Sequence, residues 1–574
     1  MRKYLLAACL VSGVAVIGIG VRASRRRPSV PPIRLVTDAR LLAADSSGEW
    51  LTYGRDYANR RFVPFTQINR RTVHRLKTLW HHGARGLFKG YVKTESTPIV
   101  TDGMLIYTDP GVQLSRPGNH VIAVDLRTGR ELWAWYHKSI RMALCCGLAN
   151  RGVALYGDKI YVGTLDARLV ALDRRTGGVV WEQQVADPAD GYSFSMAPLA
   201  AGGKILIGSS GGEFSIRGFL DAYDPETGRR LWRFWTIPSP EEGGWWGGLS
   251  TTTPDGDKLP RDTAQERRDS AAWSDAWRRG GGPVWTTPAY DPELGLVLFG
   301  IGNPSPVDGI VPPGDNLYTT SLAAVDIATG KLRWYHQMVP HNVWDYDPAS
   351  PPVIMTVLQD GRPVPMVAEA GKTGWVYIFD RRSGRQLRRS DPFVPLEHNF
   401  PAPTREGVRA APSARGGSNW AAAAFSPKTG ALYVLGSYFP MRFKLDSAAG
   451  AMADEKSRRT GGFTGRHAAG YFEEFENDGR FGTVTAIDVA TGTIRWQQKV
   501  HGPLMFGGAL ATAGDLVFVG ETPNLAALDA ETGQLLWRGE VENGVIGPPI
   551  SFVVDGQQRV AVTSTRGVTV FGLK

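Results

Sequence analysis

The 574-residue sequence predicts an all-β fold, an eight-bladed β-propeller. A repeated motif, its spacing and the high glycine content carry this prediction. The motif has alternating apolar residues followed by Asp-x-x-Thr-Gly-x-x-x-Trp, and copies recur about every 50 residues, or at about twice that distance where one copy has diverged. A period near 40–50 residues with strand patterning indicates blades of four strands. We expect one propeller over residues 46–574.

Each copy of the motif predicts a strand, a turn and a second strand. Apolar alternation marks the strands. The Asp side chain bonds nearby backbone, Gly supplies a positive φ, and Trp gives every unit the same packing anchor. Clear copies begin at Asp125, Asp173, Asp224, Asp326, Asp488 and Asp529, and weaker ones at Asp291, Asp380 (where Arg388 replaces Trp) and Ser426.

Two long irregular segments interrupt the repeat, at about residues 239–282 and 441–482. Insertions of this size in propellers usually decorate one face, often over a site. We therefore expect both segments on the functional face. A propeller that serves only as a scaffold remains the alternative at this point.

The first 27 residues predict a signal peptide or an N-terminal membrane anchor. Arg2 and Lys3 precede an apolar run from Tyr4 to Val21. No Ala-x-Ala cleavage site follows, and Arg25, Arg26 and Arg27 come soon after the run. We expect an export signal that is retained or poorly cleaved. The body is then periplasmic, either free or attached to the inner membrane.

The body of the chain is only mildly basic. Six cations lie in the leader, which leaves 59 basic and 55 acidic residues, a net charge near +4. No basic stripe with interleaved aromatic residues occurs, which argues against nucleic acid as a partner. A positive patch for an acidic partner stays open.

Cys145 and Cys146 are adjacent, and the one other cysteine, Cys9, lies in the leader. An oxidising compartment allows the pair to form a disulfide. Neighbouring Cα atoms lie ~3.8 Å apart across a trans peptide, less than the ~4.4–6.8 Å usual in disulfides, so such a ring is strained. Strain of this kind persists where the surroundings hold it, often at a functional site. On the doublet alone, two reduced structural thiols are an equal alternative.

Ten short motifs follow one another along the body. They are Trp50-x-x-Tyr53-Gly54-Arg55, Arg61…Gln67-Ile68-Asn69, Cys145-Cys146…Asn150-Arg151-Gly152, Gly163-Thr164-Leu165-Asp166, Gly208-Ser209-Ser210-Gly211-Gly212-Glu213, Gly280-Gly281-Gly282…Trp285, Gly302-Asn303-Pro304, His341…Trp344-Asp345-Tyr346-Asp347, Gly417…Asn419-Trp420 and Leu510-Ala511-Thr512-Ala513-Gly514. Each is weak alone. Together, in order and inside an eight-bladed repeat, they resemble the pyrroloquinoline quinone (PQQ) dependent alcohol dehydrogenases, the large subunits of methanol and ethanol dehydrogenases.

The resemblance implies PQQ as the cofactor. PQQ is a flat o-quinone with three carboxylates, so both of its faces need cover and its edge needs cations. By resemblance, Trp285 stacks on one face and a Cys145–Cys146 disulfide ring covers the other. Arg151 pairs with a carboxylate, and Lys372 lies near the quinone oxygens, where it stabilises negative charge. Further implied contacts are Glu95, Thr164, Ser210, Gly211, Gly212 and Asn419; an ordinary turn residue is the alternative for each.

The resemblance also implies a metal ion, held by Glu213, Asn303, Asp345 and Asp347. Hard oxygen ligands suit Ca²⁺ and not zinc, and the ion acts as a Lewis acid on the quinone carbonyl. Asp345 is the expected catalytic base for the substrate hydroxyl proton. The extra carboxylate of Asp347 favours a trivalent lanthanide ion, but sugar- and polyol-oxidising relatives carry Asp there too, and Pro348 departs from the glycine usual in lanthanide enzymes. Ca²⁺ and a lanthanide ion both stay open.

The implied function is a periplasmic dehydrogenase that oxidises an alcohol to an aldehyde by metal-assisted hydride transfer to PQQ. The sequence contains no Cys-x-x-Cys-His, so electrons are expected to leave through a separate soluble c-type cytochrome. A PQQ-dependent sugar or polyol dehydrogenase is the alternative within enzymes. A non-enzymatic propeller has no need for this set of site residues. The small Gly212, and Phe506 in place of the family's usual Trp, leave the substrate open. The oligomeric state, a homodimer included, is open as well.

Overall fold

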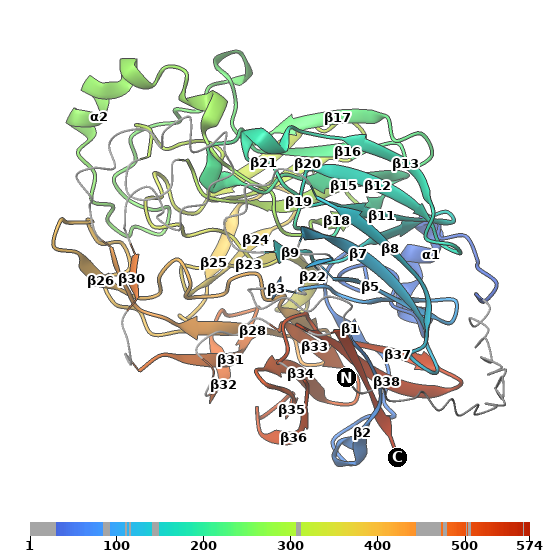
Figure 1. The fold of residues 1–574 in the computed structure, drawn as a ribbon. Helices are drawn as coiled ribbons and strands as arrows, with labels where there is room; N and C mark the ends of the chain where they lie inside the picture. The colour runs from blue at the N-terminus through green and yellow to red at the C-terminus, as the bar shows by residue number, and fades with distance from the viewer. Residues whose placement is uncertain are drawn as a thin grey trace, which may run out of the picture.

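A computed structural model describes residues 30–83, 92–93, 95–109, 112–113, 116–139, 148–305, 311–443, 472–474, 479–500, 502, 507–542, 544–565 and 567–574. Within these ranges the strands form eight four-stranded antiparallel blades, and their first strands pack against one another around the centre of the ring (Figure 1). The predicted eight-bladed propeller is confirmed.

The blades follow the order of the chain, and we number them by position. Blade 2 contains β4 (Ile99–Thr101), β5 (Met104–Asp109), β7 (Arg116–Asp125) and β8 (Glu131–Lys138); blade 3 contains β10 (Ala154–Tyr156), β11 (Lys159–Gly163), β12 (Arg168–Asp173) and β13 (Val179–Gln184); blade 4 contains β14 (Leu199–Ala201), β15 (Lys204–Gly208), β16 (Phe219–Tyr223) and β17 (Arg230–Trp235); blade 5 contains β18 (Ala289–Asp291), β19 (Leu296–Ile301), β20 (Ser321–Asp326) and β21 (Leu332–Gln337). Blade 6 contains β22 (Val353–Gln359), β23 (Arg362–Ala370), β24 (Val376–Asp380) and β25 (Gln386–Arg389); blade 7 contains β27 (Ala424–Ser426), β28 (Ala431–Tyr438), β31 (Phe481–Asp488) and β32 (Ile494–Val500); blade 8 contains β33 (Ala509–Thr512), β34 (Leu516–Glu521), β35 (Asn524–Asp529) and β36 (Leu535–Glu540).

Blade 1 closes the ring with strands from both ends of the chain. It contains β37 (Ile550–Val554), β38 (Gln557–Ser564) and β39 (Gly567–Leu573), and its outer strand is β2 (Leu76–Gly83). The antiparallel register places Leu76 opposite Leu573. Hydrogen bonds between the two ends therefore hold the ring closed.

The tryptophan of one blade covers the turn glycine of the next. At Gly177, where φ is 71°, an added Cβ would lie 2.5 Å from Cε3 of Trp133, and the Trp133 indole donates to the Arg174 carbonyl at 3.1 Å. The same packing joins Trp80–Gly129, Trp181–Gly228, Trp232–Gly330, Trp334–Gly384 and Trp496–Gly533. Arg388, which replaces a tryptophan, donates to the Val489 carbonyl in the turn of the next blade at 2.9 Å. The repeated motif thus specifies how neighbouring blades dock.

An N-terminal segment, residues 48–63, crosses the inside of the ring and ends in β1 (Phe62–Val63). It follows α1 (Asp38–Leu42), and β1 pairs in parallel with β33. Its backbone bonds to the first strands of six blades, through the pairs Gly48–Val553, Trp50–Val100, Tyr57–Tyr290, Ala58–Ile354, Arg60–Phe425 and Arg61–Ala511. This segment ties together blades that are far apart in sequence.

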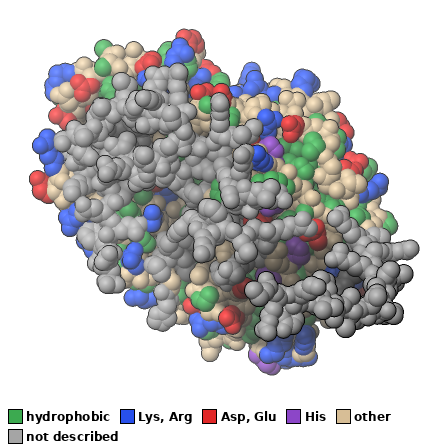
Figure 2. Space-filling model, viewed as in Figure 1, with side chains coloured by type: hydrophobic (Ala, Val, Ile, Leu, Met, Phe, Trp, Pro, Cys, Tyr) green, Lys and Arg blue, Asp and Glu red, His purple; other side chains and the backbone are tan. Residues whose placement is uncertain are grey.

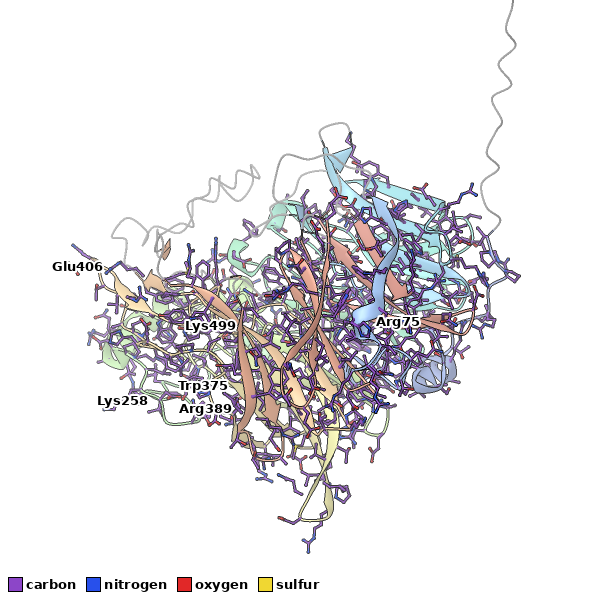
Figure 3. All side chains as sticks on the ribbon, turned by 90° about the horizontal axis from the view of Figure 1, so that it is seen from below. Arg75, Lys258, Trp375, Arg389, Glu406 and Lys499 are labelled. Carbon is purple, nitrogen blue, oxygen red and sulfur yellow. The ribbon has the colours of Figure 1, made fainter. Side chains whose placement is uncertain are left out.

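The first insertion, 239–282, connects β17 to β18 and carries α2 (Thr263–Asp269). In Figure 1 it lies on the same side of the molecule as the small sheet of β26 (Val408–Ala410), β29 (Met441–Phe443) and β30 (Phe472–Glu474). Figure 3 agrees, since Lys258 of the insertion and Glu406 beside β26 lie on one side. Most of the second insertion, 441–482, lies outside the described residues.

Figure 2 shows Lys and Arg side chains interspersed with Asp and Glu on the described part of the face in view. In the described ranges no helix is both long enough and apolar enough to span a membrane. The leader, residues 1–27, lies outside them, so its role as a signal or an anchor stays a prediction.

Candidate functional site

The predicted site residues gather at one end of the ring. Each one either precedes the first strand of a blade or follows the second strand, and because these two strands are antiparallel, both positions lie at the same end. Residues before a first strand are Glu95, Arg151, Trp285, Asp345, Asp347 and Asn419; residues after a second strand are Thr164, Ser210, Gly211, Gly212, Glu213, Asn303 and Lys372.

Arg151 and Glu95 form a buried ion pair in this region. Nη2 of Arg151 lies 2.5 Å from Oε2 of Glu95, and the two side chains are 4% and 2% exposed. The guanidinium carbon lies 4.9 Å from the centroid of the Trp285 ring, and Nη1 donates to the Trp285 carbonyl at 3.1 Å. Glu95, Arg151 and Trp285, which are far apart in sequence, therefore meet in the structure, with a cation beside an aromatic face.

Tyr53 of the N-terminal segment is fully buried near the charges of this pair. Burial raises the pKa of its phenol, the charges of Arg61 and Arg151 lower it, and Glu95 raises it. The phenol is therefore within electrostatic reach of Arg151 and Glu95.

Ser195 belongs to the site, and the sequence interpretation missed it. Its hydroxyl accepts from Nη1 of Arg151 at 2.9 Å and lies 2.8 Å from the hydroxyl of Ser210. A lone serine carries no motif. The available signal was its position before β14, which corresponds to Arg151 before β10 and Trp285 before β18.

Gly211 and Gly212 allow the Glu213 turn to approach its neighbours. Gly211 has a φ of 113°, and an added Cβ would lie 2.1 Å from the Gly191 carbonyl oxygen. A Cβ on Gly212 would lie 2.9 Å from Cδ of Pro283 and 3.4 Å from Oδ1 of Asn303. The absence of a side chain at Gly212 is therefore explained by close packing of blades 4 and 5.

Thr164 and Asn419 are less closely tied to this centre. The Thr164 hydroxyl is fully buried, donates to Oδ1 of Asp166 at 2.6 Å and accepts from the Arg168 amide at 3.0 Å. Its proton is thus already used within its own turn. Asn419 is partly exposed, and the preceding Ser418 amide donates to the Gly371 carbonyl at 3.0 Å, next to Lys372.

Lys372 joins the two aspartates of the Trp344–Asp347 motif. Its Nζ lies 2.8 Å from Oδ2 of Asp345 and 3.2 Å from Oδ2 of Asp347. Burial raises the pKa of Asp345 well above its usual value; Lys372 lowers it, while Asp347 and Glu213 raise it. Burial also raises the pKa of Glu213, and Asp347 adds to that rise. Burial lowers the pKa of Lys372, but the two aspartates outweigh this and raise it.

Three oxygen atoms in this cluster fit a hard cation. Oδ1 of Asn303, Asp345 and Asp347 are each buried without a hydrogen-bond partner among the described residues, while Nδ2 of Asn303 donates to the Pro304 carbonyl at 2.9 Å. Buried acceptors without donors are costly unless an ion or water satisfies them. In the described ranges no three His, Cys, Asp or Glu side chains are gathered closely enough to hold a metal. The metal site and its ligands therefore stay predictions.

Cys145, Cys146 and Phe506 lie outside the described residues, so the disulfide and its position over PQQ stay predictions.

Known proteins share this architecture. The family model "Glucose/ethanol/alcohol dehydrogenase, beta-propeller domain" of the PQQ proteins matches residues 50–390 and 385–560. "Quinohemoprotein alcohol dehydrogenase ADH IIB" of Pseudomonas putida is 34% identical, over 99% of this chain and 78% of its own length. "Quinoprotein alcohol dehydrogenase PedH", also from Pseudomonas putida, is 34% identical over 90% of this chain and 86% of its own.

Solved structures agree with these sequence matches. The quinohemoprotein alcohol dehydrogenase of Comamonas testosteroni superimposes with a TM-score of 0.78 at 29% identity, covering 94% of this chain and 82% of that one. A europium-containing methanol dehydrogenase gives a TM-score of 0.74 at 28% identity and 92% coverage of both chains. The protein described here belongs to the family of PQQ-dependent alcohol dehydrogenases.

Proposed function

We propose that this enzyme oxidises an alcohol to an aldehyde, with Asp345 as the base that accepts the hydroxyl proton. One observation carries the proposal. A partly buried aspartate with a raised pKa is paired with Lys372, and its buried second oxygen has no partner among the described residues, at the end of the ring where Arg151 and Trp285 also lie. Buried carboxylates with shifted pKa values are typical of general acid and base groups.

The residues of the pocket fit a flat, anionic cofactor. PQQ, when bound, supplies the acceptor for two electrons, and Arg151, Glu95, Ser195, Ser210 and Trp285 are the residues that would hold it. Arg151 offers a guanidinium for a carboxylate, and its Nε has no hydrogen-bond partner among the described residues. Trp285 offers an aromatic face.

Asp345 has to be ionised in order to accept a proton from the substrate. Burial favours its neutral form, while Lys372 favours the ionised form that can accept a proton. A cation bound by Glu213, Asn303, Asp345 and Asp347 would lower the pKa of Asp345 further, and it would supply Lewis acidity at the site. The substrate hydroxyl would then lose its proton to the Asp345 carboxylate.

The metal is proposed to be Ca²⁺ or a lanthanide ion. Asp347 adds a third oxygen to those of Asn303 and Asp345, and higher ligand charge suits a trivalent ion. The similarity to a europium-containing methanol dehydrogenase supports the lanthanide option.

We also propose that the body is periplasmic, exported by residues 1–27, and that a separate soluble c-type cytochrome accepts the electrons. The leader composition and the absence of Cys-x-x-Cys-His from the sequence support these two points. Cell fractionation, with an antibody that recognises the propeller, would show whether the protein is in the periplasm. Reduction of added cytochrome c, with and without alcohol, would test the acceptor.

Reconstitution tests the reaction. The purified apoprotein is loaded with PQQ and either Ca²⁺ or La³⁺, and primary alcohols, aldehydes and sugars are screened with an artificial electron acceptor. We expect alcohol oxidation that requires both PQQ and one of the metals. Turnover of sugars alone would favour the sugar or polyol dehydrogenase, and turnover without PQQ would contradict the proposal.

A further inference from the structure

Asp345 has an unusual backbone conformation. Its φ is 60°, in the left-handed region, which is unfavourable for a non-glycine residue although Asp tolerates it better than most. The carboxylate does not stabilise this conformation locally, because Oδ2 accepts from Lys372 and Oδ1 has no hydrogen-bond partner among the described residues. Another group has to hold the backbone.

Asn342 holds the backbone on both sides of Asp345. Its Oδ1 accepts from the amide of Trp344 at 3.0 Å and from the amide of Tyr346 at 3.2 Å. Its side chain is buried, at 2% exposure. Because backbone amides can only donate, the two bonds also determine which atom of the Asn342 amide is the oxygen.

The other end of the Asn342 side chain points to blade 5. Nδ2 donates to the hydroxyl of Thr320 at 2.9 Å. The Thr320 amide in turn donates to the carbonyl of Gly302 at 3.0 Å, and Gly302 directly precedes Asn303. A short hydrogen-bonded path therefore connects the turn of Asp345 in blade 6 with the segment of Asn303 in blade 5.

We propose that Asn342 is a positioning residue that sets the place of the Asp345 carboxylate relative to Oδ1 of Asn303. The proposal rests on the function given above, in which Asp345 is the base and the Asp345 carboxylate and Oδ1 of Asn303 bind the same cation. In this role Asn342 would act through other residues and would contact neither substrate nor cofactor. It acts through three buried hydrogen bonds, two to backbone amides and one to a hydroxyl.

Gln558 provides a matched control in blade 1. It is also 2% exposed, its Oε1 accepts from the Ile68 amide at 2.9 Å, and its Nε2 donates to the Ser551 hydroxyl at 3.1 Å. It lies in β38, where none of the site residues is found. Gln558→Ala therefore removes a comparable buried amide without touching the site, so it reports the purely structural loss.

The experiment compares Asn342→Ala, Asn342→Asp and Gln558→Ala with the wild type, each loaded with PQQ. Two quantities are measured: the rise in Tm that Ca²⁺ or La³⁺ produces, and kcat and KM for an alcohol. Asn342→Asp keeps both acceptor bonds to the Trp344 and Tyr346 amides, so it serves as the conservative rescue.

We expect Asn342→Ala to lose most of the metal-induced rise in Tm and to lower kcat by about 10- to 100-fold, with a smaller change in KM, since a misplacement of about 1 Å can cost about 10²-fold. Asn342→Asp should retain the metal-induced rise. Gln558→Ala should lower Tm but keep both the metal response and kcat.

Equal metal responses and kcat values in Asn342→Ala and Gln558→Ala would overturn the positioning role. A wild type that binds metal but oxidises no alcohol would refute the proposed function alone, and the metal-induced rise in Tm would still decide the role of Asn342. Absence of any metal response in the wild type would overturn the inference, because no ligand set would then depend on Asn342.

Discussion

Nζ of Lys372 lies 2.8 Å from Oδ2 of Asp345, so the expected base forms an ion pair with the Lys372 ammonium group. The pair determines how strongly the carboxylate resists ionisation. Burial, Asp347 and Glu213 all raise the pKa of Asp345, and Lys372 is the neighbour that lowers it. By lowering this pKa, the charge of Lys372 allows Asp345 to be ionised, and so to accept a proton, at lower pH.

Lys372→Met should move the pH dependence of kcat/KM to higher pH. Without the ammonium, the pKa of Asp345 rises further, so the carboxylate is ionised and active only at higher pH. The activity at neutral pH should fall by about 10²-fold or more, as expected when an electrostatic group is removed. Lys372→Arg retains the charge and should shift the profile less. An unchanged profile in the Met variant would show that Lys372 does not control the base.

Asp345→Asn should keep PQQ bound but lose most turnover. The amide cannot accept the hydroxyl proton, and loss of a general base typically costs ~10²–10⁴-fold in rate. Cofactor loading is checked by absorbance and kcat by acceptor reduction. Near-normal turnover in a fully loaded variant would remove Asp345 from the mechanism.

Asp347→Ala should change the choice of metal. The carboxylate adds negative charge beside Asp345, and a trivalent ion gains more from each anionic ligand than a divalent one. Activation by La³⁺ should therefore weaken more than activation by Ca²⁺, measured as activity against added metal at full PQQ loading. If both activation curves move together, Asp347 does not select the ion, and the sugar dehydrogenase alternative gains support.

Glu369→Gln should flatten the pH dependence of stability. Glu369 lies in β23, is fully buried, and neither carboxyl oxygen has a hydrogen-bond partner among the described residues. Burial raises the pKa of Glu369 well above its usual value, so the folded state binds a proton that the unfolded state releases. The contribution of Glu369 to stability is then most favourable at low pH, and it becomes less favourable as the pH rises from the unfolded pKa towards the raised folded pKa.

The measurement for Glu369 is Tm between about pH 5 and pH 8. The wild type should lose more Tm over this range than Glu369→Gln, which has no proton to release. Glu369→Ala serves as the control, since it should lower Tm at every pH by leaving a cavity. Parallel curves for the wild type and the Gln variant would mean that Glu369 does not titrate in this range.

Gly330→Ala should destabilise the contact between blades 4 and 5. Both Gly330 and Gly361 have a positive φ, 71° and 74°, so Ala pays a similar backbone cost at either position. At Gly330 an added Cβ would also lie 2.6 Å from the Trp232 ring, whereas at Gly361 it meets nothing within 4 Å. Overpacking adds about 1–3 kcal/mol. Gly330→Ala should therefore lower Tm more than Gly361→Ala, and equal losses would argue against the tryptophan contact.

The repeated motif was sufficient to predict the propeller, because each clear copy carries its own turn and its own packing anchor. Asp, Gly and Trp are local in sequence. Five of the motif tryptophans dock on the turn glycine of the next copy, namely Trp133, Trp181, Trp232, Trp334 and Trp496, so one blade specifies the placement of its neighbour. The substitution of Trp by Arg388 was visible in the sequence. Its replacement bond to Val489 was not, since that partner is 101 residues away.

For the candidate site, the sequence indicated less than it did for the fold. The amino-acid sequence showed which side chains are available: the family motifs indicated Arg151, Trp285 and Asp345 before any contact was known. The tertiary structure alone decided what those side chains do. In the structure the Thr164 hydroxyl donates to Asp166, and the Ser195 hydroxyl lies between Arg151 and Ser210. The side chain of Asn342 accepts from the backbone amides on both sides of Asp345. The physical reason is that a hydrogen bond depends on distance and direction between atoms, and ring closure brings together strand ends that lie hundreds of residues apart in the chain.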